Sequence, residues 1–304
     1  MKYDTGRAFR QALETRLQGI QHSQNIPLVR LRKQVAFERF MARLQTTQPD
    51  TWILKGGLAM QLRLGVQSRT TKDIDLLNRE LTGNIFDSLV ETASIDIGDW
   101  FTFEVGQTSD APEDEFGSHR FQVVCRLDGR VFEKFHVDVG LGDLMVGDYD
   151  CLRFDPILEF AGIASAEIPC YPIPQQIAEK LHALTREYAS GSSTRGKDLV
   201  DILLLASLGS IDGVLLSRSV DSTFAVRTTH PVPQKMPSLS NTLRGEYVRL
   251  ARELGLAFED FDAAEEALAD FANPIFRSND PGMWNADNWS WDSNRSNSNL
   301  TEHG

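Results

Sequence analysis

Apolar residues recur at helical spacing near the start of the chain and predict two helices, over residues 6–22 and 28–46. The apolar stripe of the first predicted helix consists of Phe9, Leu13, Leu17 and Ile20. In the second predicted helix, an apolar stripe lies beside a row of arginines. This pattern is typical of helices that dock on a hydrophobic core and leave one side polar.

Short apolar or alternating runs follow and predict strands. These runs are residues 52–55, 73–77, 100–105, 120–127 and 131–139, with helical patterns at 58–64 and 84–92. The order helix, strand, helix, strand and then a meander predicts an α+β fold with a mixed sheet.

From Ile173 onward the pattern turns helical. Helices are predicted at 174–188, 196–208, 239–254 and 260–272, with a small-residue linker at 189–194. Residues 278–304 are rich in Asn, Ser, Asp and Trp without periodicity and predict a tail of low order. The predicted domains are a basic helical segment at 1–48, a core at 49–165, a helical domain at 166–277 and the tail at 278–304.

Composition narrows the class of protein. Hydrophobic residues make up 41% of the 304 positions and charged residues 24%, which indicates a globular protein with ample core. Neither a membrane-spanning run nor a signal peptide is recognisable, so no membrane association is expected. Three cysteines without ligand-like spacing fit a reducing cytoplasm and argue against a zinc site.

Charge is distributed unevenly along the chain. The net charge is −12, yet residues 1–72 hold 13 Lys and Arg against four Asp and Glu. Arg32, Arg39 and Arg43 fall on one side of the second predicted helix and are candidates for RNA binding. The same arginines would also suit an ordinary surface helix, or could pair with the acidic remainder of the chain.

Two carboxylates are candidate residues of a functional site. Asp73 and Asp75 are two apart on a predicted strand, so both side chains point to one face, about 6–7 Å apart along the chain. Oxygen ligands of this kind suit a hard cation such as Mg²⁺. Upstream, Gly56 and Gly57 would let backbone amides approach a phosphate without an intruding side chain. Together these features predict a metal site beside a phosphate site.

A third metal ligand is expected in Asp138. It lies in an alternating run, residues 135–139, which would place it beside the first pair in a sheet. Carboxylates shared between adjacent strands are the donors used in metal-assisted phosphoryl transfer.

A lysine and two further aspartates mark the helical part. Lys180 lies at the edge of an apolar stripe, where a positive charge is costly unless it meets an anion such as a triphosphate. Snorkelling to solvent is the alternative. Asp198 and Asp201 are three apart on a very apolar helix and need partners, so a salt-bridged helix junction is a strong alternative to a functional role.

Four ordered motifs carry a resemblance to a known family. They are Leu54-Lys55-Gly56-Gly57, Arg69-Thr70-Thr71-Lys72-Asp73-Ile74-Asp75, Glu179-Lys180-Leu181-His182-Ala183-Leu184 and Arg195-Gly196-Lys197-Asp198-Leu199-Val200-Asp201. This ordered set closely resembles the AbiEii toxins, the nucleotidyltransferase-like toxins of type IV toxin–antitoxin systems that include the mycobacterial MenT proteins. The match covers roughly residues 50–208.

The resemblance implies a fold and an activity. It implies a polymerase-β-like nucleotidyltransferase core, an NTP substrate, Mg²⁺ and a cognate antitoxin. For the MenT branch it implies addition of nucleotides to the acceptor end of tRNA. The implied catalytic residues are Asp73, Asp75, Lys180 and Asp201, and the implied nucleotide-binding residues are Lys55, Gly56, Gly57, Thr71, Lys180 and Asp198. Leu58 departs from the family, which commonly has Thr or Ser after the glycine doublet.

Three functional hypotheses stay open at this point. The first is a toxin that transfers a nucleotide to RNA. The second is a nucleotide-dependent transferase that acts on a protein or a small molecule. The third is a catalytically silent protein that binds a nucleotide or a partner. The intact carboxylate pair argues against the third hypothesis, and the basic N-terminal region favours the first.

Overall fold

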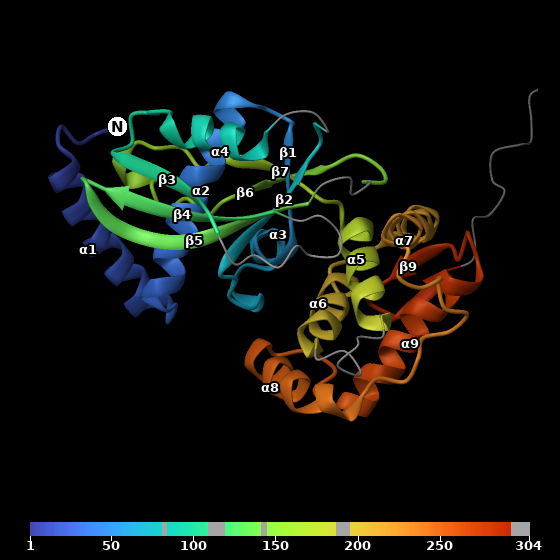
Figure 1. Cartoon of the computed structure of the whole chain (residues 1–304). Helices are drawn as coiled ribbons and strands as arrows, with labels where there is room; N and C mark the ends of the chain where they lie inside the picture. Colours follow the sequence, from blue (N-terminus) through green and yellow to red (C-terminus); the bar gives the residue numbers. More distant parts are fainter. Residues whose placement is uncertain (81–83, 109–118, 141–144, 187–194, 293–304) are drawn as a thin grey trace, which may run out of the picture. The chain divides into compact units, whose positions relative to one another are not determined.

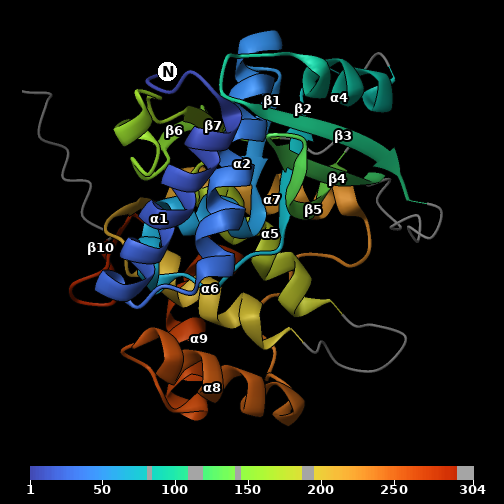
Figure 2. The same cartoon turned by 90° about the vertical axis from the view of Figure 1, so that its left-hand side faces the viewer.

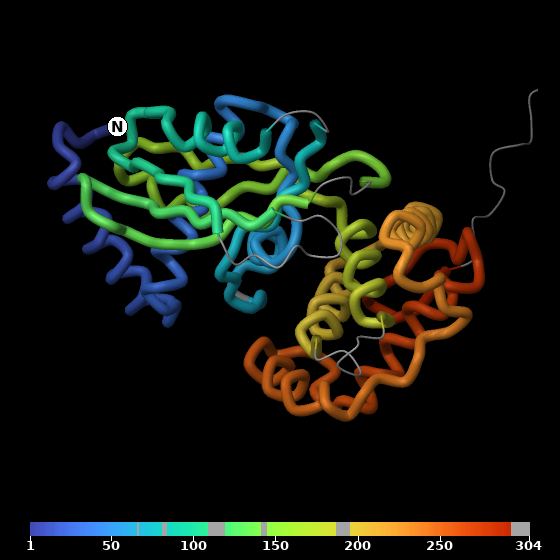
Figure 3. Tube along the Cα trace, in the orientation of Figure 1, coloured from blue at the N-terminus to red at the C-terminus, as the bar shows by residue number. Residues whose placement is uncertain are grey.

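The computed structural model describes residues 1–80, 84–108, 119–140, 145–186 and 195–292. The chain forms two compact units. Unit 1 comprises Met1–Asp143 and Tyr149–Tyr171, and unit 2 comprises Leu144–Asp148 and Pro172–Gly304. Figure 3 traces the chain through both units and is coloured by residue number. The segment predicted as a separate domain, residues 1–48, lies within unit 1.

Unit 1 contains four helices and seven strands within its described residues. In chain order they are α1 (Gly6–Gln24), α2 (Leu28–Thr47), β1 (Trp52–Lys55), α3 (Gly56–Leu64), β2 (Asp73–Asn78), α4 (Ile85–Ser94), β3 (Phe101–Gln107), β4 (His119–Leu127), β5 (Arg130–Gly140), β6 (Asp150–Arg153) and β7 (Glu167–Cys170). Short 3₁₀ turns follow α3 and β6, at Gly65–Gln67 and Glu159–Ala161. Strands β6 and β7 were not predicted.

The seven strands form one mixed sheet in the order β3-β4-β5-β2-β1-β7-β6 (Figure 1). Strand β2 runs parallel to β5, and β1 runs parallel to β7. The other neighbouring strands pair antiparallel. The predicted mixed sheet and α+β class are therefore confirmed, and the central place of β2 puts its side chains between those of β1 and β5.

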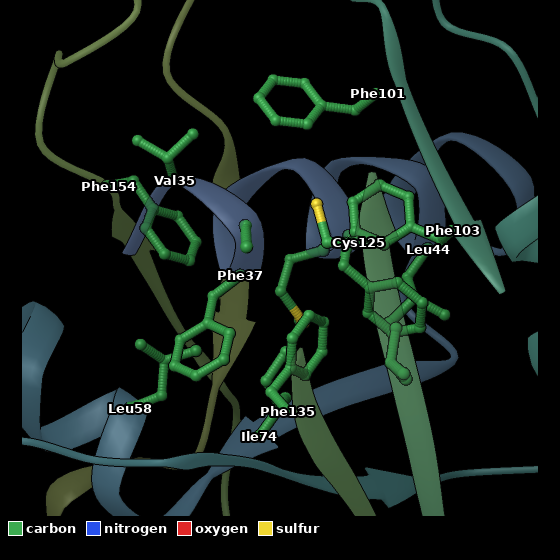
Figure 4. Packing of buried hydrophobic residues seen from close by; sticks show 14 of the residues in the cluster. Val35, Phe37, Leu44, Leu58, Ile74, Phe101, Phe103, Cys125, Phe135 and Phe154 are labelled. Carbon is green, nitrogen blue, oxygen red and sulfur yellow. The ribbon is translucent and has the colours of Figure 1, made fainter. Parts of the chain in front are cut away.

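One face of this sheet is covered by the N-terminal helices. Helices α1 and α2 lie side by side in both views (Figures 1 and 2), and their apolar stripes join the inward residues of the sheet in one cluster. Phe37 of α2 meets Phe135 of β5 edge-on, with 5.0 Å between ring centroids, and Leu58 and Ile74 lie nearby in the same cluster (Figure 4). Alternation along each strand therefore turns polar residues such as Asp73 and Asp75 to the opposite face.

Unit 2 is mainly helical. Its described elements are α5 (Ile173–Thr185), α6 (Gly196–Ala206), β8 (Ile211–Asp212), α7 (Gly213–Arg227), a 3₁₀ turn at Asn241–Leu243, α8 (Arg244–Leu254), α9 (Phe261–Arg277), β9 (Met283–Asn285) and β10 (Ser290–Asp292). Helix α7 was missed by the sequence analysis. Its N-cap is Asp212, whose carboxylate accepts hydrogen bonds from the amides of Val214 and Leu215.

The prediction of a low-order tail is wrong for its first part. Strands β9 and β10 pair with each other, and β9 also pairs with β8, which gives a small antiparallel sheet. Three indole N–H groups anchor this segment on helical carbonyls, from Trp284 to Ala206, from Trp289 to Ala267 and from Trp291 to Phe271. These tryptophans hold the segment on the helices, although its overall polar composition gave no sign of a packed structure.

Some sequence predictions fall outside the described residues. These are the linker 189–194, the end of the helix predicted at 174–188 and the tail residues 293–304. None of the helices in the described ranges combines the length and the apolarity needed to cross a membrane.

Candidate active site

The carboxylate pair lies on β2, on the face away from the hydrophobic cluster. Ile74 and Leu76 are fully buried in the cluster, whereas Asp73 and Asp75 are half-buried on the other face. Alternation along the strand thus gives the arrangement that the sequence predicted. Two like charges on one strand face repel each other unless a cation or a proton intervenes.

Strand β5 brings the third carboxylate beside this pair. In the parallel register, Asp138 is the partner of Asp75, as the sequence predicted. Both Asp138 oxygens, however, accept hydrogen bonds from Arg120 of β4, at 2.7 and 2.6 Å. This bidentate pair neutralises Asp138, so its role as a metal ligand stays a prediction.

Two residues on this face were missed by the sequence analysis. His136 is the register partner of Asp73, and its Nδ1 lies 3.3 Å from Asp73 Oδ1. Its position two residues before Asp138 on the same alternating run could have indicated that both side chains share one face. Arg120 could not be assigned from sequence, because its proximity to Asp138 depends on the register between β4 and β5.

The glycine doublet packs directly against the carboxylates. A Cβ on Gly56 would lie 2.0 Å from Asp75 Oδ2, and one on Gly57 would lie 2.7 Å from Thr71 Oγ1. Gly56 also has a φ of 63°, which disfavours residues with a side chain. The doublet opens α3, so its amides lie at a helix N-terminus that favours an anion. The doublet therefore lies beside the carboxylates, and its phosphate-binding role stays a prediction.

Lys55 and Thr71 lie beside the doublet. Lys55 is the register partner of Asp75 across β1 and β2, and its Nζ lies 5.8 Å from the ring centroid of Tyr171. Thr71 donates from its hydroxyl to the Asp73 carbonyl at 3.1 Å. Both therefore border the carboxylates, and their nucleotide-binding roles stay predictions.

Leu58 occupies the position where the family commonly has Thr or Ser. Its side chain is fully buried in the hydrophobic cluster (Figure 4). The substitution therefore adds to the core beneath α3 instead of removing a group from the polar face.

The electrostatics of Asp75 follow from its surroundings. Burial raises its pKa to about 6, and the charges of Asp138 and Asp73 also raise it, whereas Lys55 and the Gly57 amide lower it. The Gly57 amide donates to Asp75 Oδ2 over a long 3.4 Å. The ionised carboxylate thus lacks full compensation from the protein and would gain from a bound cation.

A hard cation fits this carboxylate pair. Mg²⁺ commonly takes one or two protein carboxylates and completes its shell with water and substrate phosphates. Among the described residues, no three His, Cys, Asp or Glu side chains converge to hold a metal by themselves. Asp73 and Asp75 are the residues that would hold such a cation.

We expect alanine at position 56 to disturb this arrangement. The added Cβ must displace the Asp75 carboxylate, and a non-glycine residue at this φ adds strain of roughly 1–3 kcal/mol. Nucleotide transfer should fall by about a hundred-fold, the effect of a misplacement of about 1 Å. Gly106→Ala is the control, because a Cβ there meets no atom within 4 Å. Full activity of Gly56→Ala would show that the close approach is not needed.

Stability of the metal-free protein should depend on the titration of Asp75. Because its pKa is higher in the folded state than the ordinary value of 3.8, the folded state binds more protons between about pH 4 and pH 6. The free energy of unfolding should therefore contain a contribution that falls as pH rises through this window, by at most about 2–3 kcal/mol. Urea titrations at several pH values, with Asp75→Asn as the comparison, measure this contribution. It should be absent from the variant and reduced by added Mg²⁺.

Lys180 belongs to unit 2 and forms a buried ion cluster there. Its Nζ lies 2.6 Å from Asp201 Oδ2 and 3.4 Å from Asp198 Oδ1, and all three side chains are about nine-tenths buried or more. Arg195 approaches Asp198 at 3.6 Å. The salt-bridged junction between α5 and α6, foreseen as an alternative, is therefore present. A contact from Lys180 to a triphosphate, and roles for Asp198 and Asp201 in catalysis, stay predictions.

The basic stripe predicted on α2 is wrong for two of its three arginines. Arg43 is fully buried and Arg39 is 5% exposed, because both pair with Asp99 at 2.7 Å. Arg32 is partly exposed and pairs with Glu14 at 2.6 Å. The spacing put the three arginines on one side of the helix, but Arg39 and Arg43 face inward and cannot contact RNA.

Comparisons with known proteins identify the family of the chain. The family model described as nucleotidyl transferase AbiEii toxin, type IV TA system, matches residues 39–287. A comparison with curated proteins found no match. Among solved structures, MenT4, a nucleotidyltransferase toxin from Mycobacterium tuberculosis H37Rv, is similar with a TM-score of 0.54 and 18% identity. The similarity covers 86% of this chain and 99% of that chain, and at this identity it shows a shared fold. The carboxylate pair and glycine doublet lie within the range of the family model, and the chain belongs to the AbiEii family of nucleotidyltransferase toxins from type IV toxin–antitoxin systems.

Proposed function

We propose that the chain transfers a nucleoside monophosphate from an NTP to RNA, at the 3′ acceptor end of tRNA. The observation that carries this proposal is the contact of the Gly56-Gly57 doublet with the Asp75 carboxylate. This contact places helix N-terminal amides, which bind phosphate, against carboxylates that bind a divalent cation. Such a pairing suits the triphosphate of a nucleotide with its metal.

The residues would act as follows. Asp73 and Asp75 hold Mg²⁺, which when bound offsets charge on the phosphates. The amides of the doublet orient the triphosphate. A terminal RNA hydroxyl attacks the α-phosphorus in line, a new P–O bond forms and the bond to pyrophosphate breaks. Asp138 is the candidate acceptor for the hydroxyl proton, once Arg120 releases one of its oxygens.

RNA is favoured as the acceptor by the resemblance to the MenT branch and by the excess of Lys and Arg in residues 1–72. Burial of Arg39 and Arg43 leaves Arg32 as the candidate RNA contact on α2. A cognate antitoxin protein is the expected partner of a type IV toxin. The three free cysteines suit the reducing cytoplasm as its site of action.

The test is a labelling experiment with the full-length protein. Each of the four α-³²P-labelled NTPs is incubated with Mg²⁺, total cellular RNA and protein, and the products are separated by size. We expect label in a tRNA-sized band, and none with Asp75→Asn. Label on a protein or a small molecule would favour the alternative transferase. No label on any acceptor, with the protein folded, would overturn the proposal.

A further inference from the structure

One carboxylate of the candidate site is held by a cation from unit 1 itself. Arg120 of β4 lies directly opposite Asp138 of β5, and its guanidinium donates to both carboxylate oxygens, at 2.7 and 2.6 Å. Asp138 is in turn the register partner of Asp75 on β2. Neighbouring strands lie about 4.8 Å apart, so Arg120 borders the group of carboxylates that would hold a metal ion.

Another arginine of β4 shows what an ordinary cross-strand ion pair looks like. Arg126 lies on the same face of the strand and pairs with Glu104 of β3 at 2.8 and 3.4 Å. Glu104 is 62% exposed and lies on the side of β4 away from β2. Asp138 is 21% exposed and borders Asp75, so water screens its charge less. The Arg120 pair therefore neutralises a carboxylate at a place where a second carboxylate repels it.

Arg120 can change partner without any movement of the sheet. Its backbone is fixed in the ladder between β4 and β5, and its carbonyl accepts a hydrogen bond from the Thr108 hydroxyl at 2.8 Å. Its side chain, however, is 45% exposed, and ion pairs with this exposure contribute little to stability. The guanidinium can therefore leave Asp138 at low cost when a better anion arrives.

The chemistry of the guanidinium indicates which anion that is. A divalent cation and a guanidinium repel each other when they share one carboxylate. The guanidinium fork fits phosphate oxygens as well as it fits carboxylate oxygens. We propose that Arg120 exchanges partners: it holds Asp138 while the site is empty and moves to a phosphate of the bound NTP, which frees Asp138 for the metal. This inference rests on the proposed function and assigns a further residue to its nucleotide site.

Replacement with methionine tests both halves of the exchange, because methionine keeps an unbranched side chain and removes the charge. In Arg120→Met, binding of Mn²⁺ alone, which shares the preference of Mg²⁺ for oxygen ligands, should become about three- to tenfold tighter, since Asp138 is already free. Binding of each NTP with saturating Mg²⁺ should become about tenfold weaker, since a charged contact to phosphate is lost. Arg120→Lys keeps the charge without the fork and should give smaller shifts of the same signs.

Arg126→Met is the matched control, because it removes the other bidentate pair of β4 and should change neither affinity. A further variant combines Arg120→Met with Asp138→Asn, where the gain in Mn²⁺ affinity over Asp138→Asn alone should disappear. Metal and NTP affinities are measured by titration calorimetry on the full-length proteins without RNA. Filter binding measures tRNA affinity without NTP, which Arg120→Met should leave unchanged. Urea denaturation without metal verifies that each variant is folded.

The outcomes separate the inference from the proposed function. An unchanged affinity of Arg120→Met for Mn²⁺ or for NTP overturns the inference alone, and so does a loss of both affinities, which shows a structural role. A gain in Mn²⁺ affinity that persists in the Asp138→Asn background reflects general electrostatics and also overturns it. Weaker binding of tRNA with unchanged binding of NTP assigns Arg120 to the RNA backbone and overturns it. Absence of NTP binding by the wild type overturns the proposed function and the inference together.

Discussion

Asparagine in place of Asp75 is expected to abolish nucleotide transfer and to stabilise the metal-free protein. The charged carboxylate is half-buried beside Asp138 and Asp73, and its raised pKa measures the cost of keeping it ionised. Removing the charge should add about 1–2 kcal/mol to the free energy of unfolding at pH 7.5. Transfer should fall by about a thousand-fold or more, as when groups that stabilise transition-state charge are lost.

Because transfer should fall while stability rises, general unfolding cannot explain the loss of transfer. Transfer is measured as label incorporated from the preferred NTP, and stability is measured by urea denaturation without metal. Asp73→Asn should also abolish transfer, with a smaller gain in stability because its side chain is 34% exposed. Asp4→Asn, at an exposed position in unit 1, should change neither quantity. Wild-type transfer by Asp75→Asn would exclude the carboxylate pair from catalysis.

Methionine in place of Arg43 is expected to destabilise unit 1 by about 3–5 kcal/mol, because it removes one of the two guanidinium groups that pair with the buried Asp99 carboxylate. Arg43 donates to both oxygens of Asp99 and to the carbonyls of Ile95, Arg39 and Phe101, and its guanidinium stacks 4.8 Å from the Phe103 ring centroid. Burial alone would raise the pKa of Asp99, but the hydrogen bonds and charges of Arg43 and Arg39 lower it below the ordinary value.

Arg32→Met is the control for this prediction, because it removes an arginine from the same helix whose ion pair with Glu14 is partly exposed. Its cost should be about 0–1 kcal/mol, which is typical of surface pairs. Urea denaturation of both variants at pH 7 measures the difference. Equal stability of the two would show that the Asp99 cluster contributes little. Neutralising all three arginines together would unfold the protein instead of testing RNA binding, so only Arg32 can be used for that purpose.

Much of the fold could be predicted because its elements carry regular apolar periods. Strand β1 was predicted with its observed bounds, and α1, α2 and β5 within one or two residues. Helix α7 was missed because its buried side includes small polar residues, among them Ser217, Ser219 and Thr223, which do not register as an apolar stripe. The C-terminal strands were missed because single tryptophans supply their burial within a polar segment.

In the candidate site, too, local patterns predicted some features and missed others. Asp73, Asp75 and Asp138 could be placed together because alternation along two strands determines which side chains share a face. The inward direction of Arg43 could not, because its partner Asp99 is 56 residues away in the sequence. The position of the Arg120 guanidinium beside Asp138 could not be predicted either, because it depends on the register between β4 and β5. Local patterns identify which groups carry the chemistry, and long-range pairing determines which of them are already neutralised.

The tryptophan-anchored strands also determine when unit 2 can be completed during synthesis. Strand β8 ends at Asp212 but pairs with β9, which begins only at Met283. Chains emerge from the ribosome from the N-terminus, and unit 1 can begin to fold first. A chain released before Met283 would already contain Lys180, Asp198 and Asp201, yet would lack the strands and indoles that anchor onto α6 and α9. Incomplete translation products would therefore carry the carboxylate pair of unit 1 together with a second unit that lacks its last strands.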